Sequence, residues 1–231
     1  MSEQKAPQGV DITGKTIAVL GGTGDQGRGL ARRFALAGHT VYIGSRSAER
    51  AATVANDLVA GESEQVRVYG LDNAEAAAQG DIVIVAVPWD GHRELLVALA
   101  DRLAGKIVVD CVNPLGFDKK GPFALDVPEG SAAQQAAEVL PGSRVTAAFH
   151  HVSAKLLLDP EVAQIDLDVL VLGEDREATD VVRALADSIP GARGVFGGRL
   201  RNAHQVEALT ANLIAVNRRY KTHAGIRITG L

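Results

Sequence analysis

Residues 16–27 read TIAVLGGTGDQG, a run of apolar and β-branched residues followed at once by a glycine-rich turn. The run predicts a buried strand, and the G-x-G-x-x-G pattern at 22–27 lies where that strand would lead into a helix. There Gly22 permits a tight turn, Gly24 leaves room for a pyrophosphate, and Gly27 lets the helix pack closely on the strand. Free N–H groups at the helix start would hold the phosphates. The segment therefore predicts the first βαβ unit of a dinucleotide-binding sheet, with a purely structural glycine turn as the alternative.

Strand and helix patterns alternate along the rest of the chain. Further strands are expected at 40–43, 66–69, 81–87, 106–109 and 145–148, with helices between most of them. This alternation is typical of an α/β fold, and we expect a Rossmann-type, doubly wound, mostly parallel sheet over residues 14–150.

The pattern changes after Phe149. A strand at 168–172, a helix at 176–189, a short strand at 194–196 and a long helix at 202–220 follow. We expect residues 151–231 to form a small C-terminal α/β lid domain that closes the cleft. The polar residues 1–13 are interpreted as a flexible leader, and the proline-rich stretch 113–130 as a long functional loop.

Composition excludes several classes of function. The 231 residues carry a formal charge of −4, which argues against a general nucleic-acid binder, since those need a basic face. No apolar run approaches the roughly 18 residues that span a membrane. The single cysteine, Cys111, cannot form an internal disulfide, which fits a cytoplasmic protein. The histidines lack metal-ligand spacing, so we expect no metal site.

The end of the second strand indicates which dinucleotide would bind. An NAD enzyme usually places Asp or Glu there to bind the ribose 2′-hydroxyl, whereas this chain has Gly44-Ser45-Arg46-Ser47 and then Arg50. Arg46 can stack on adenine and pair with a 2′-phosphate, Ser45 can donate a hydrogen bond, and Arg50 adds charge. NADP is therefore predicted; a solvated Ser/Arg helix start is the alternative.

Three short motifs follow later strands, at the sheet edge where ligands bind in such folds. They are Val87-Pro88-Trp89, Asn113-Pro114 and His150-His151. Pro88 ends its strand and offers apolar atoms to a nicotinamide, whereas Trp89 has packing as its alternative. Because neighbouring side chains point in different directions, we expect at most one of the two histidines to face a ligand. A histidine satisfied by nearby backbone is the alternative there.

Taken together, the runs AVLGGTGDQGRGLARRFALAGH, IGSRSAER, AVPWD, KIVVDCVNP, AFHHVSA and RNAHQVEALTANLI resemble the F420H2:NADP+ oxidoreductases, the coenzyme F420-dependent NADP oxidoreductase family. The resemblance extends from Lys15 to the end of the chain. It implies reversible hydride transfer between NADP(H) and the deazaflavin coenzyme F420.

The resemblance also assigns residues. With the motifs above it gives as NADP-binding residues Gly22, Thr23, Gly24, Asp25, Gln26, Gly27, Ser45, Arg46, Arg50, Val87, Pro88, Asn113 and Ala154. On the F420 side it implies Pro114, Ala224 and Gly225, with His150 as the catalytic hydrogen-bond donor. We expect Lys155, Arg199 or Arg201 to steer the anionic F420 tail and Arg218, Arg219 and Lys221 to favour a helix end instead.

Two other functions fit the same residues. An NADPH-dependent imine reductase of the pyrroline-carboxylate reductase type would share the fold and the V-x-P edge. A non-catalytic NADPH-binding sensor is the third reading. In all cases the expected partners are small molecules, without nucleic acid or membrane, and we expect a homodimer.

Overall fold

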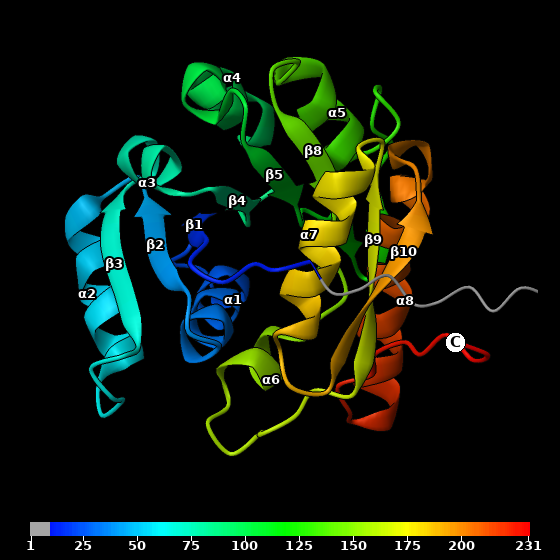
Figure 1. Cartoon of the computed structure of the whole chain (residues 1–231). Coiled ribbons are helices and arrows are strands. Elements are labelled where there is room, and N and C mark those ends of the chain that lie inside the picture. The colour runs from blue at the N-terminus through cyan, green and yellow to red at the C-terminus, as the bar shows by residue number, and fades with distance from the viewer. Residues whose placement is uncertain (1–9) are drawn as a thin grey trace, which may run out of the picture.

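One large sheet organises the part of the chain that this computed structural model describes, residues 10–231. Residues 1–9, most of the predicted leader, lie outside the described residues. The sheet has eight strands in the order β10-β9-β8-β5-β4-β1-β2-β3, with β3 and β10 at opposite ends (Figure 1). Its strands are β1 (Thr16–Leu20), β2 (Thr40–Ser45), β3 (Arg67–Asp72), β4 (Ile82–Val85), β5 (Ile107–Asp110), β8 (Arg144–Ala147), β9 (Leu167–Gly173) and β10 (Ala192–Gly198).

Helices cover both faces of this sheet. They are α1 (Asp25–Leu36), α2 (Ala48–Val59), α3 (Asn73–Gln79), α4 (His92–Leu103), α5 (Ala132–Val139), α6 (Ala154–Leu158), α7 (Arg176–Asp187), α8 (Ala203–Tyr220) and the 3-10 turn η1 (Leu200–Asn202). The alternation of side chains along the strands sorts the core into two clusters. Ile17 and Val19 of β1 pack with α1, α2, α6 and α7, whereas Ala18 and Leu20 pack with α3, α4, α5 and α8. This is the doubly wound arrangement that the sequence predicts.

The strands after β8 join the main sheet. β9 pairs antiparallel with β8, through Thr146↔Gly173 and Ala147↔Leu172, and β10 runs parallel to β9. They therefore lengthen the main sheet rather than forming one of their own. The physical reason is that six of the seven residues of β9 are buried, so it is covered on both faces like an inner strand of the sheet.

Four elements escape the sequence patterns. The expected loop 113–130 contains an antiparallel hairpin of β6 (Leu115–Asp118) and β7 (Gly121–Ala124). The Asp118 side chain accepts the N–H groups of Lys120 and Gly121 and so closes the hairpin turn. Helices α3 and α6, of seven and five residues, are too short to show a helical period.

Candidate functional site

The glycine-rich turn after β1 is shaped by close packing. Gly21, rather than Gly22, adopts the left-handed conformation, with φ 73°, and a Cβ there would lie 2.7 Å from the Ala86 carbonyl oxygen. A Cβ on Gly22 would lie 2.6 Å from Ile43, and one on Gly27 2.7 Å from the Gly22 Cα. These positions exclude side chains because helix α1 and strands β1, β2 and β4 meet there.

A cavity of about 680 Å³ opens beyond this turn, and we call it the dinucleotide cavity. Its wall includes nine of the predicted NADP-binding residues, namely Thr23, Gly24, Asp25, Gln26, Ser45, Arg46, Arg50, Val87 and Pro88. Gly22 and Gly27 shape the turn without lining the cavity. Sequence reasoning missed Asn73, Asp90 and Leu95 in this wall, although Asn73 directly follows a strand at the same edge.

The far end of the dinucleotide cavity is positively charged. Arg46 and Arg50 are both exposed, and neither forms an ion pair with any residue between 10 and 231. The Ser47 hydroxyl accepts the N–H of Arg50 at 3.2 Å and caps helix α2, while the Ser45 hydroxyl accepts the N–H of Ser47. The β2–α2 turn thus presents two unpaired guanidinium groups and a helix N-terminus to an anion.

A second cavity of about 370 Å³ adjoins the first. Gln26, Ala86 and Val87 line both cavities, so the two meet where β4 ends and α1 begins. The rest of its wall comes from the turns after β5 and β8, from helix α8 and from the segment beyond it: Cys111, Val112, Asn113, His150, His151, Val152, Ser153, Thr210, Leu213, Ile214, Asn217 and Ala224.

Both histidines line the second cavity, whereas the sequence predicts that at most one of them faces a ligand; which of the two does so stays a prediction. Both reach the cavity because of Phe149, which is buried and adopts a left-handed φ of 65° that is rare for an aromatic residue. This kink turns the backbone after β8 so that His150 and His151 reach the same wall. Among the described residues none provides a hydrogen-bond partner to their ring nitrogens.

Three side chains hold the kinked backbone. Gln26 donates to the Phe149 carbonyl at 3.2 Å, and Asn113 and Thr210 donate to the His150 carbonyl at 2.8 and 3.1 Å. Helix α1, the turn after β5 and helix α8 thus fix the same two peptide groups. The Oδ1 of Asn113 is buried without a partner in residues 10–231, which leaves an acceptor at the cavity wall.

The other predicted site residues are placed differently. Ala224 lines the second cavity, but Gly225 packs against Leu167, where a Cβ would lie 2.9 Å from the leucine Cβ. Pro114 is buried outside both walls, and Ala154 begins helix α6 one residue beyond the wall residue Ser153. The assignments of Pro114, Gly225 and Ala154 as contacts are therefore not supported by the cavity walls.

Helix α8 supplies a wall that the sequence reasoning missed. Thr210, Leu213, Ile214 and Asn217 all face the second cavity. Leu213 shares a helical spacing of three and four residues with Val206, Leu209 and Val216, a pattern that by itself indicates packing and not a cavity wall. The helix is fixed by Glu207, whose carboxylate accepts the N–H groups of Ala132 and Ala133 at 3.0 and 3.2 Å.

The described cavities belong to a chain with close sequence relatives. Residues 16–114 match the family described as NADP oxidoreductase coenzyme F420-dependent. The F420-dependent NADP reductase of Methanothermobacter thermautotrophicus is 43% identical over 93% of this chain and 95% of its own length. The chain belongs to the F420-dependent NADP reductases.

Solved structures agree with this reductase family. A structure from Arthrobacter sp. FB24, described as an F420-dependent NADP reductase, has a TM-score of 0.79 at 30% identity and covers 94% of this chain and 100% of that one. The pyrroline-5-carboxylate reductase of Coxiella burnetii has a TM-score of 0.61 at 13% identity, covering 89% of this chain and 67% of that one. At that identity the second likeness shows the fold alone.

The described part of the reductase, residues 10–231, contains no group of three His, Cys, Asp or Glu side chains arranged to hold a metal ion. Over the same residues, none of the helices is long and apolar enough to cross a bilayer.

Burial keeps the two cavity histidines neutral. Loss of solvent lowers the pKa of His150 and of His151 to about 4. A neutral imidazole carries one N–H and one acceptor nitrogen, so it can donate a hydrogen bond without carrying charge.

We expect His150→Ala to lower kcat on the order of tenfold, because a single positioned donor is lost. His151→Ala should have a smaller effect on kcat. His150 is neutral above about pH 5, so it should cause no step near pH 6.5 in the pH profile of kcat. The wild type and the His150 variant should therefore have profiles of the same shape in that range. Steady-state rates from pH 5 to 8 test this, and a collapse in the His151 variant alone would identify His151 as the donor.

Proposed function

We propose that this reductase transfers hydride reversibly between reduced F420 and NADP+, with NADP in the dinucleotide cavity and the deazaflavin in the second cavity. One observation carries the proposal: the two cavities share Gln26, Ala86 and Val87 and so meet at the carboxyl end of β4. Two ring systems entering from opposite sides would face one another there.

The wall residues fit such a pair of ligands. The glycine turn and the start of α1 bind phosphates, and Arg46 and Arg50 bind the 2′-phosphate. In the second cavity, the apolar side chains Val87, Leu213 and Ile214 suit a flat ring, and the unpartnered polar atoms of Asn113 and His150 suit its polar edge.

The bound pair supplies the hydride donor and acceptor, and the chain's contribution is positioning. Asn113 and Thr210 fix the His150 backbone, and the neutral His150 ring offers a donor where charge builds up on the deazaflavin. The half-buried walls exclude water from the point where the cavities meet. Imine reduction is supported only by a likeness of fold, and NADPH sensing alone would leave the second cavity without a ligand.

The test is a spectral titration of the NADP-loaded protein with F420, followed by addition of reduced F420. Loss of the reduced-deazaflavin spectrum together with growth of NADPH absorbance is the expected result. Failure to bind F420, combined with NADPH-dependent reduction of a cyclic imine, would assign the protein to the imine reductases instead.

The basic residues predicted to steer the F420 tail differ in their distance from the second cavity. Arg199 pairs with Glu174 at 2.9 Å, and Arg201 lies in the 3-10 turn η1, before the end of α8 that is remote from Asn217. The basic residues at the other end of α8, Arg218, Arg219 and Lys221, directly follow the wall residue Asn217. Lys155 is exposed two residues after the wall residue Ser153.

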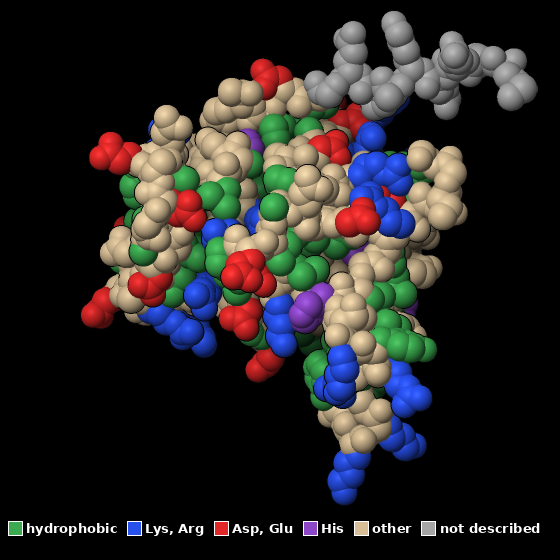
Figure 2. All heavy atoms as spheres, turned by 90° about the horizontal axis from the view of Figure 1, so that it is seen from below, with side chains coloured by type: hydrophobic (Ala, Val, Ile, Leu, Met, Phe, Trp, Pro, Cys, Tyr) green, Lys and Arg blue, Asp and Glu red, His purple; other side chains and the backbone are tan. Residues whose placement is uncertain are grey.

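The β6–β7 hairpin adds to this basic end of α8. A Cβ on Gly121 would lie 3.8 Å from the Arg218 guanidinium, so the hairpin turn approaches the end of α8. The exposed Lys119 and Lys120 directly precede Gly121 in that turn. Figure 2 shows Lys and Arg side chains gathered on a narrow projection of the molecule, whereas charges of both signs mix over its body.

We expect the association rate of F420 to fall as salt is raised, with a smaller change in the dissociation rate, because exposed cations steer an anionic tail. Replacing Arg218 and Arg219 by Gln should weaken the salt dependence more than replacing Arg199 and Arg201. Stopped-flow binding at increasing salt measures both rates. The reverse ranking would restore the assignment of the tail to Arg199 and Arg201.

We further propose that the reductase acts in the cytoplasm as a homodimer. The exposed Phe117 and Phe123 of the hairpin offer apolar surface to a second copy. The single buried Cys111 suits a reducing compartment. Sedimentation equilibrium tests the dimer, and a single monomeric species at micromolar concentration would reject it.

A further inference from the structure

The segment after helix α8, residues 222–231, contributes Ala224 to the wall of the second cavity although it contains neither helix nor strand. Lys221 ends the helix in the left-handed conformation, and the Ala224 N–H donates to the Asn217 side chain at 2.6 Å. Ala224 and Asn217 both line the second cavity, and neither lines the dinucleotide cavity. We call residues 222–231 the closing segment.

The closing segment has little apolar anchorage. None of its residues is buried, and Ile228 and Leu231 are among the exposed large hydrophobic side chains. A chain segment with few buried apolar contacts opens easily unless other contacts hold it. Polar contacts must therefore place Ala224 at the cavity.

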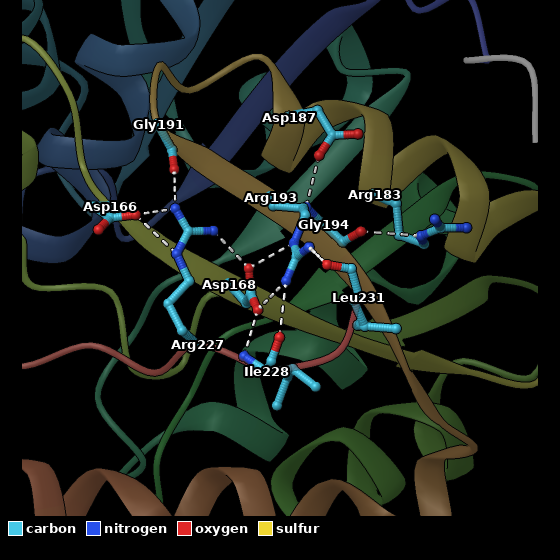
Figure 3. Close-up of polar contacts among 10 residues, drawn as sticks. All are labelled: Asp166, Asp168, Arg183, Asp187, Gly191, Arg193, Gly194, Arg227, Ile228 and Leu231. Atoms are coloured by element: carbon cyan, nitrogen blue, oxygen red, sulfur yellow. Dashed lines mark hydrogen bonds and ion pairs between the residues drawn. The ribbon is translucent and has the colours of Figure 1, made fainter. Parts of the chain in front are cut away.

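Those contacts converge on Asp168, which is the second residue of β9 and has a fully buried side chain (Figure 3). Its carboxylate accepts from Arg193 of β10 at 2.8 Å, from Arg227 at 2.7 Å and from the N–H of Ile228 at 2.7 Å. The Asp168 N–H in turn donates to the Ile226 carbonyl at 2.8 Å. One buried aspartate thus binds three consecutive residues of the closing segment.

Arg193 of β10 and Arg227 of the closing segment make further contacts that hold the segment in place. Arg193 also donates to the carbonyl of Ile228 at 3.2 Å and to the oxygen of Leu231 at 3.0 Å. Arg227 also binds Asp166 and the Gly191 carbonyl. Figure 3 shows both guanidinium groups pointing at the Asp168 carboxylate from opposite directions.

The charge pattern explains why a buried aspartate is tolerated there. The hydrogen bond from Arg193 outweighs the desolvation of the carboxyl, and the pKa of Asp168 lies well below its usual range. The carboxylate remains charged at all moderately acidic and neutral pH values. Removing one arginine still leaves Asp168 paired with the other, so the fold tolerates such a change.

We propose that Asp168, Arg193 and Arg227 form a latch that holds the closing segment as the outer wall of the second cavity, and that they are thereby positioning residues for the deazaflavin. The proposal rests on the proposed function, since it takes F420 as the occupant of that cavity. The latch touches no wall of the dinucleotide cavity, so it acts on one substrate and not on the other.

The test compares Arg227→Gln with Arg176→Gln, which removes an arginine whose side chain is 91% exposed on helix α7. We expect KM for F420 to rise about tenfold in Arg227→Gln, as the loss of charge-assisted hydrogen bonds implies, with kcat and KM for NADP changed less than about twofold. Arg227→Lys should restore part of the affinity. Arg176→Gln should behave as the wild type.

Hydrogen exchange gives a readout that does not depend on F420. Amides of the closing segment should exchange faster in Arg227→Gln, while those of β1, β4 and β5 remain unchanged. Faster exchange with an unaltered KM for F420 would overturn the role in positioning, and unaltered exchange would overturn the latch itself. A wild-type protein that fails to turn over F420 would instead reject the proposed function, and the exchange rates would still decide whether the latch holds the segment.

Discussion

Replacing Arg46 and Arg50 together by Gln should lower kcat/KM for NADP by at least about a hundredfold and leave kcat/KM for NAD nearly unchanged. Both side chains line the dinucleotide cavity, are exposed, and have no carboxylate partner in the described chain, so their charge is available to a ligand. A hydrogen bond to a charged group contributes about 1.5–3 kcal/mol, and two such bonds account for a hundredfold or more. NAD lacks the 2′-phosphate and gains nothing from either arginine.

The matched control removes the same net charge elsewhere. Arg102 on α4 and Arg176 on α7 are both exposed and line neither cavity, so the double Gln variant at these positions should retain the preference for NADP. Steady-state kinetics with both dinucleotides measure the ratio. Equal loss of activity with NADP and NAD in the Arg46/Arg50 variant would show that these arginines support the fold rather than the 2′-phosphate.

The fold and the dinucleotide cavity follow from local sequence. The strand–turn–helix signal at 16–27 and the alternation after it require nothing beyond neighbouring residues, so the sheet and its first cavity could be predicted. β9 and β10 belong to that sheet because β9 pairs with β8, and the residues of β9 and β10 alone do not indicate which strand they pair with. The sequence patterns therefore place β9 and β10 in the C-terminal region without specifying the strand with which they pair.

The second cavity could be predicted less well because its walls depend on contacts between distant segments. The left-handed φ of Phe149 brings both histidines to one wall, and the donors that hold this kink are about 120, 40 and 60 residues away along the chain. The Asp168 latch likewise joins residues some 60 positions apart. Such long-range hydrogen bonds leave no periodic trace in a sequence, whereas a glycine turn does.

Glu207 is expected to control both stability and the second cavity, because it connects α8 to the start of α5. Its carboxylate accepts two N–H groups that no helical carbonyl could satisfy. In Glu207→Ala these donors lose their partner, and we expect the free energy of unfolding to fall by about 2–4 kcal/mol. KM for F420 should rise at the same time, because Thr210, Leu213 and Asn217 lie on the same helix.

The ionisation of Glu207 distinguishes this anchor from ordinary packing. Burial, together with the nearby Asp110, raises its pKa to about 7, while the N–H groups of α5 and the nearby His92 oppose that rise. Because the folded pKa is raised above the unfolded value, this group's contribution to stability is full at low pH and is lost as pH rises toward 7. A shift of this size corresponds to roughly 2–3 kcal/mol between pH 5 and pH 8.

Glu207→Gln cannot ionise, so its stability should change less with rising pH than that of the wild type. His150 and His151 titrate in both proteins, with depressed pKa values whose effect appears as pH falls below about 6.5, so they cancel in the comparison. Urea unfolding of wild type and Glu207→Gln at pH 5, 6, 7 and 8 measures the difference. The half-exposed Glu138 of α5 provides the control as Glu138→Gln. Parallel curves for wild type and Glu207→Gln would show that Glu207 is already charged at pH 5, and the pH-dependent anchor would then be rejected.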